Sequence, residues 1–231
     1  MVASLLLAGC AGAPPAATAP AQPAPISELA ATYAALQASG GRVFALDPGR
    51  SDVRIYAFRA GRAAAMGHNH VLTAPQFEGY FHRATEAPAM RFDLAFRLDQ
   101  LALDDPQLRA TLGGGFATVV SEDAIASTRE HMLGANNFQA QQFPWVRIRS
   151  LQIVGEAPKF AAQVVVELHG QAHEQWVPLT VHGLPDHLTV TGSLVLRQTD
   201  FGVQPFSVLG GLLAVEDAVV VDFTLQGDEH R

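Results

Sequence analysis

Two histidines separated by a single residue form the densest cluster of chemically capable side chains in the sequence. They lie in the segment from Met66 to Leu72, which reads Met-Gly-His-Asn-His-Val-Leu. Side chains alternate along an extended chain, so His68 and His70 would share a face with Met66 and Leu72, while Asn69 would face the other way. Two imidazoles on an otherwise apolar stripe are either buried and hydrogen-bonded within the fold or directed at a ligand.

A metal ion is one candidate ligand for this segment. His68 and His70 could chelate one ion, with His82 approaching from further along the chain, and neutral imidazoles suit Zn or Cu. The alternatives are a structural role, in which buried histidines fix a strand crossing, and an anchoring role for a bound organic molecule. The residues alone leave these three possibilities open.

The sequence lacks the common catalytic motifs. It contains no Gly-x-Ser-x-Gly, His-Glu-x-x-His, P-loop or Gly-x-Gly-x-x-Gly pattern. Carboxylate pairs occur at Asp104-Asp105, Glu122-Asp123 and Glu216-Asp217, at expected turns or helix starts where acids are common for local reasons. We therefore predict a binding protein and not an enzyme, without a cofactor.

Composition excludes two further classes of function. The net charge is -7, with fourteen Arg, one Lys and no basic cluster, which argues against nucleic-acid binding. Cys10 is the only cysteine, so neither an internal disulfide nor a cysteine-based metal site is possible.

The N-terminus predicts membrane anchoring. An apolar run ends in Leu7-Ala8-Gly9-Cys10, which resembles the lipobox of bacterial lipoproteins and implies a signal over 1–9 and lipidation of Cys10. No basic residue precedes this run, so we expect the signal to be truncated and the natural start to lie upstream. The resemblance implies a periplasmic protein, and Ala11 after the cysteine favours the outer membrane. No segment approaches the roughly eighteen apolar residues of a membrane-spanning helix.

Two short segments connect this anchor to the main domain. Residues 10–25 are rich in Ala and Pro and predict a semi-rigid tether. Residues 26–41 predict a short helix and linker, with Ser27 as the cap and Gly40-Gly41 as the stop. This helix either packs on the domain or extends the tether.

Residues 42–228 alternate between apolar and polar side chains, which predicts antiparallel strands with one dry face. The candidate strands are 52–59, 70–82, 90–98, 145–153, 162–168, 175–182, 187–197 and 219–225. Roughly eight strands with one inner face predict an all-β, antiparallel barrel. Ser121 and the two acids after it predict one helix over 121–133, which we expect to lie over a barrel mouth.

Four motifs follow one another along this domain. They are Phe44-Ala45-Leu46-Asp47-Pro48, His131-Met132-Leu133 with Asn137-Phe138 and Phe143-Pro144, Leu168-His169-Gly170 with Val177-Pro178-Leu179, and Thr199-Asp200-Phe201-Gly202-Val203. Their order and spacing resemble the YceI-like family over about residues 43 to 226. Gln198 and Thr199 precede Asp-Phe-Gly where the family often has Arg, which leaves the identity of the ligand open.

The resemblance implies a lipocalin-like barrel that binds a polyisoprenoid or a quinone in the periplasm. His68, Asn69 and His70 would then anchor the head group, for example at a quinone carbonyl. The predicted ligand-binding residues also include Phe92, Phe96, Phe138, Trp145, Phe201 and Phe206, and further lining candidates are Phe77, Phe81, Phe160 and Phe223. A metal-binding module and an envelope protein with a filled core are the alternative functions. An exposed edge at an open barrel seam would make a homodimer plausible.

Overall fold

The computed structural model describes residues 26–84 and 89–230. The predicted signal over 1–9, the lipidation site Cys10 and the tether over 10–25 lie outside the described residues.

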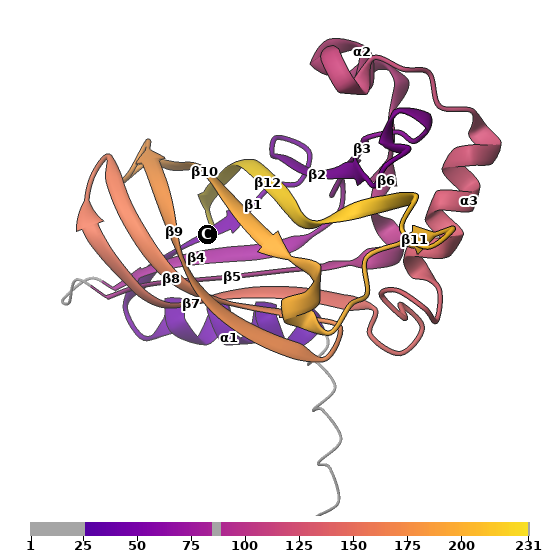
Figure 1. Ribbon diagram of the computed structural model, residues 1–231. Coiled ribbons are helices and arrows are strands. Elements are labelled where there is room, and N and C mark those ends of the chain that lie inside the picture. Colours follow the sequence, from indigo (N-terminus) through magenta and orange to yellow (C-terminus); the bar gives the residue numbers. More distant parts are fainter. Residues whose placement is uncertain (1–25, 85–88, 231) are drawn as a thin grey trace, which may run out of the picture.

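The fold is a closed antiparallel barrel (Figure 1). Eight strands follow one another around the ring, and pairing between the first and the last closes it. In ring order they are β1 (Gly41–Leu46), β4 (Glu78–Ala84), β5 (Met90–Arg97), β7 (Trp145–Glu156), β8 (Lys159–Leu168), β9 (Gln171–His182), β10 (His187–Arg197) and β12 (Leu213–Glu229). The predicted all-β barrel of about eight strands is thus confirmed.

The barrel wall is extended at one end by shorter strands. β12 also pairs with β2 (Asp52–Ala60), which leads to β3 (His70–Thr73) and then β6 (Ala102–Leu103), while β11 (Ser207–Val208) forms a small hairpin with β12. The prediction of one strand over 70–82 was wrong. Pro75 interrupts that run, so β3 pairs with β2 and β4 pairs with β1.

Alternation places one face of each strand inside the barrel. The inward residues of β5 are those at even positions, as predicted, because Met90, Phe92 and Phe96 all line the interior. In β7 the pairing is irregular between Ser150 and Gln152. Inward-facing residues have even numbers before this point and odd numbers after it.

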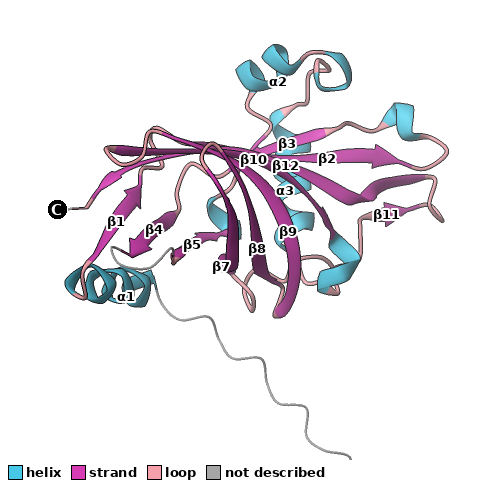
Figure 2. Cartoon of the chain, turned by 90° about the vertical axis from the view of Figure 1, so that its left-hand side faces the viewer, coloured by secondary structure: helices cyan, strands magenta, loops and turns pink. Residues whose placement is uncertain are grey.

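Helix α1 (Ile26–Ala38) lies against the outside of the barrel (Figures 1 and 2). Leu29 and Tyr33 are buried there with Val43 and Ala95, and the Tyr33 hydroxyl donates a 2.8 Å hydrogen bond to Asp93. The helix therefore packs on the domain. It begins at Ile26, one residue before the predicted cap Ser27.

Two further helices lie at the end where β2, β3 and β11 project (Figure 1). α3 (Glu122–Leu133) begins after Ser121, whose Oγ accepts the amide of Ala124, and it confirms the predicted helix. α2 (Pro106–Leu112) was not predicted; Asp105 caps it and proline occupies its first turn. Short 3-10 turns cover Ala64–Met66, Leu98–Gln100, Gly114–Phe116 and Gln198–Phe201. None of the helices in the described ranges combines the length and hydropathy needed to cross a membrane.

Candidate functional site

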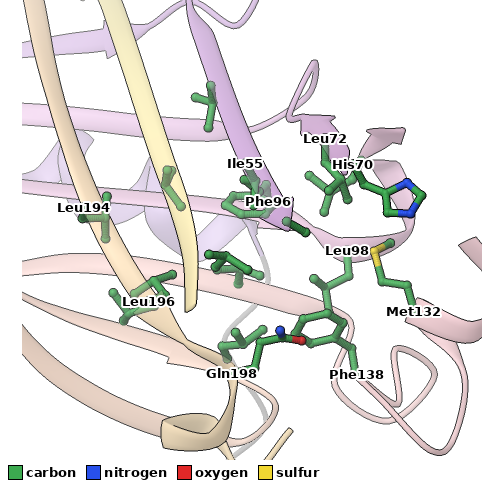
Figure 3. A pocket seen from close by; sticks show the side chains of 18 of the residues that line it. Ile55, His70, Leu72, Phe96, Leu98, Met132, Phe138, Leu194, Leu196 and Gln198 are labelled. Carbon is green, nitrogen blue, oxygen red and sulfur yellow. The ribbon is translucent and has the colours of Figure 1, made fainter. Parts of the chain in front are cut away.

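The barrel encloses a cavity of about 820 Å³. Inward residues of the eight ring strands and of β2 and β3 form its wall, and α3 contributes at one end, where Met132 lies close to His70 (Figure 3). Phe96 and Ile55 lie further inside, with Leu194 beyond them (Figure 3). The interior is therefore hollow, although several aromatic rings project into it.

Polar side chains line only one end of this cavity, which we call the mouth. They come from the end of β2, the start of β3, helix α3 and the loops after it and after β10: Arg59, His68, His70, Ser127, Thr128, His131, Asn136, Asn137, Gln198, Gln204 and Ser207. The opposite end is lined by Leu46, Phe160, Leu184, Leu188 and Leu225. Such a gradient suits a molecule with a long apolar part and one polar group.

His70 is held in place by a buried carboxylate. Its Nδ1 lies 2.5 Å from Oδ2 of Asp104, and the other carboxylate oxygen accepts the amide of Val71 and the Arg109 guanidinium at 2.6 Å. Arg109 also donates to the carbonyls of Asn69 and Thr118. Asp104 is 1% exposed and Arg109 4%, so this network is closed to solvent.

The surroundings of these groups shift two pKa values. Burial pushes the pKa of Asp104 upward, but the hydrogen bonds from His70, Val71 and Arg109 outweigh it and hold that pKa below its ordinary value. Burial, followed by the neighbouring His70 and Arg109, lowers the pKa of His68. The His68 ring, whose centroid lies 6.5 Å from that of His70, therefore resists protonation.

Only part of the segment from Met66 to Leu72 follows the predicted strand. His68, His70 and Leu72 line the cavity as expected. Met66 is 77% exposed because the chain forms a 3-10 turn before Gly67 instead of extending. Asn69 is not a cavity residue; its side-chain oxygen accepts the amide of Arg59. The prediction of Asn69 as a ligand anchor is therefore not supported by its position.

The predicted aromatic residues divide between the cavity and other places. Phe92, Phe96, Phe138 and Phe206 line it, as do Phe81, Phe160 and Phe223. Trp145 does not, because it precedes the inward Val146 and stacks outside under the Arg97 guanidinium at 5.4 Å. Phe201 is fully buried in the core beside the ring of His173, and Phe77 also packs in the core without reaching the cavity.

His82 does not join the other two histidines. It neighbours the inward Phe81 on β4, so it points to the outer face of the sheet, where it lies beside Gly41. Within the described ranges, no group of three or more His, Cys, Asp and Glu side chains could hold a metal ion. The position of His82 therefore does not support the alternative of a metal site shared by His68, His70 and His82.

Sequence reasoning missed the two residues that position His70. The sequence predicts that Asp104 and Asp105 are acids at a turn or helix start, which holds for Asp105, the cap of α2, but not for the buried Asp104. The Asp105-Pro106 start of that helix was a usable signal for α2. Nothing in the sequence indicated that Arg109, one turn later, would reach back to Asp104.

Comparisons with known proteins agree with this geometry. Residues 44–227 match the family model of the YceI-like domain. The chain belongs to the YceI-like family. No curated protein matches it closely enough to count as a relative.

Two solved structures resemble this YceI-like barrel. One is BcnA from Burkholderia cenocepacia, with a TM-score of 0.56 and 16% identity over 78% of this chain and 98% of that one. Another is the YceI protein of Campylobacter jejuni, with a TM-score of 0.50 and 8% identity over 69% and 85% of the two chains. At these identities the likeness supports the shared fold alone.

Proposed function

We propose that this YceI-like protein binds one isoprenoid-type lipid, either a polyisoprenoid or a quinone, inside its barrel with the head group at the mouth. The observation that carries the proposal is the cavity of about 820 Å³ whose polar lining is confined to one end. A binding role needs no reacting groups beyond those that orient the ligand, so the proposal includes no catalysis.

The size of the cavity suits a long hydrocarbon. An apolar cavity of about 150 Å³ holds one benzene, so a cavity five times larger holds on the order of thirty carbons. Each buried methylene group contributes about 0.8 kcal/mol of transfer free energy, so a tail of that length supplies ample affinity without many polar contacts.

The two alternative functions have less support. A barrel with a filled core does not fit the open interior. A metal-binding module loses its third histidine to the outer face, and the described residues contain no group of three or more candidate metal ligands.

Native mass spectrometry of the purified full chain tests the proposal directly. We expect a bound apolar ligand that organic solvent extracts. Leu194→Trp places an indole inside the cavity and should displace the ligand, whereas Val195→Trp, on the next residue and 54% exposed, should leave occupancy unchanged. Equal occupancy in both variants would reject lipid binding. So would the absence of a bound ligand in every preparation of the wild-type protein.

We also propose that Cys10 carries a lipid anchor and that the protein faces the periplasm from the outer membrane. The support is the lipobox-like sequence before Cys10. Metabolic labelling with a fatty acid tests this: the wild type should be labelled and sediment with outer membranes, and Cys10→Ala should remain unlabelled.

A further inference from the structure

We infer that the mouth of the cavity selects a head group that donates a hydrogen bond through a hydroxyl, such as a prenyl alcohol or a hydroquinone, over the matching ether or quinone. This inference rests on the proposed lipid binding and adds the chemistry of the head group. It differs from the sequence-based expectation that the histidines bind a quinone carbonyl.

The first step is the position of the proton on His70. The carboxylate of Asp104 has no proton to give, because it is the ionised partner of the buried Arg109 guanidinium, 2.6 Å from it. Nδ1 of His70, at 2.5 Å from that carboxylate, must therefore be the donor. In a neutral imidazole the remaining nitrogen, Nε2, is then an acceptor.

The second step is the charge of the network. Arg109 and Asp104 form an ion pair at 2.6 Å, with side chains 5% and 0% exposed. The three groups therefore carry no net charge when the imidazole is neutral. The His70 side chain is only 14% exposed, so its Nε2 lies where an unpaired hydrogen-bonding group is costly.

The third step is the direction of that acceptor. The His70 ring lines the cavity at the mouth, opposite Met132 of α3 (Figure 3). Filling the cavity with a lipid removes water from this nitrogen, so the head group must supply the hydrogen-bond donor. A hydroxyl does so, whereas an ether or a quinone carbonyl only accepts and leaves Nε2 unpaired.

Three neighbouring charged or imidazole side chains at the mouth do not change this preference. His131 also lines the cavity, but it is exposed, and its Nδ1 bonds to the Ser127 carbonyl within α3. Arg59 donates to the carbonyl of Gly67 and so holds the loop before His68. His68 itself can pair with the oxygen of a hydroxyl or an ether alike, so it does not distinguish between them.

Competition between two matched probes tests the inference. Delipidated full chain is mixed with equal concentrations of geranylgeraniol and geranylgeranyl methyl ether, and native mass spectrometry reports the ratio of the two complexes. We expect the alcohol to be favoured about tenfold, because the ether leaves a buried acceptor unpaired. Decyl hydroquinone against decyl benzoquinone, under anaerobic conditions, should give the same direction.

Three variants separate the role of His70 from a general effect on the mouth. His70→Phe removes the acceptor and should bring the ratio close to one. Asp104→Asn can donate its amide to Nδ1, which moves the imidazole proton to Nε2 and should abolish or reverse the preference. His182→Phe removes an exposed histidine of β9 that does not line the cavity, and the wild-type ratio should persist. If Asp104→Asn fails to fold, His70→Phe carries the test.

The outcomes distinguish this inference from the function on which it rests. Equal binding of alcohol and ether to the wild type overturns the inference and leaves lipid binding intact. Binding of neither probe, nor of any prenyl lipid, rejects the proposed function itself. Tighter binding of geranylgeranyl phosphate than of the alcohol would also overturn the inference, because the mouth would then select charge.

Discussion

Asp104 is the residue on which the arrangement of the mouth depends. Its carboxylate connects β3, the segment after β6 and helix α2 through His70, Val71 and Arg109. Its φ of 56° is in the left-handed region, which Asn tolerates as well as Asp. Asp104→Asn therefore removes the charge and keeps the backbone. We expect the free energy of unfolding, measured in urea, to fall by about 3 kcal/mol, because Arg109 loses its buried counterion.

Asp99→Asn is the matched control for this variant. Asp99 pairs with Arg97 at 2.7 Å, but both side chains are substantially exposed. Pairs of that kind contribute about 0–1 kcal/mol, so the control should lose little stability. A similar loss in both variants would mean that the Asp104 network has no special energetic importance.

The lowered pKa of Asp104 also predicts how the difference in unfolding free energy between the wild type and Asp104→Asn depends on pH. The unfolded carboxyl titrates near 3.8 and the folded one below that value. The stabilisation is thus fully present above 3.8 and is lost as the pH falls through the folded pKa. The gap in unfolding free energy between wild type and Asp104→Asn should therefore narrow in strong acid. Urea titrations between pH 5 and pH 2 measure it, and a constant gap would contradict the assigned ionisation.

Single residues could be predicted from the sequence where local spacing determines their direction. Phe92 and Phe96 follow from alternation along one regular strand. Trp145 does not, because its direction depends on which residue of β7 first enters the ladder with β5. The ion pair between Asp104 and Arg109 could not be predicted from the sequence. It depends on the left-handed backbone of Asp104 and on the direction of the helix that follows it.

Helix α3 forms one side of the mouth, and hydrogen bonds from Arg129 fasten it to the barrel. Arg129 donates a 2.6 Å hydrogen bond to the carbonyl of Leu101 and a second one to the carbonyl of Asp99. We expect Arg129→Met to increase amide hydrogen exchange in α3 about tenfold, because a charge-assisted hydrogen bond contributes about 1.5–3 kcal/mol. Release of a bound lipid should become faster as well.

Glu130→Met provides the control within the same helix. Glu130 is the next residue and is exposed, so its loss should leave the exchange rates of α3 nearly unchanged. Hydrogen–deuterium exchange with mass spectrometric detection resolves the helix from the strands. Equal rates in the two variants would show that Arg129 does not fasten α3.

Elements were predictable where one pattern extended over many residues. β10 matches its predicted range over 187–197, and α3 matches to within one residue. β6 and β11 have two residues each, which is too short to show an alternation of apolar and polar side chains. α2 carries a capping signature, Asp105 followed by a proline. With only seven residues, however, the helix is too short to show an apolar stripe.

For the molecule as a whole, alternation predicted the barrel but not the space inside it. The same inward apolar residues could fill the interior or leave it hollow, because their number does not determine the circumference of the ring. Eight strands leave room for one small ligand when the inward side chains do not meet across the axis. The cavity of about 820 Å³ is therefore a property of the closed fold that no single strand reveals.

The volume of that cavity predicts a limit on the length of the bound chain. A tail of about thirty carbons corresponds to about six isoprene units. For a series of prenyl alcohols with two to ten units, affinity should rise steeply while each added unit is buried, and then level off once the cavity is full. Leu194→Trp reduces the space inside the barrel and should move this limit to shorter alcohols, while Val195→Trp should not. Competition by native mass spectrometry measures both limits. Affinity that rises without a break through ten units would mean that the tail extends beyond the barrel. The volume of the cavity would then not limit the length of the bound chain.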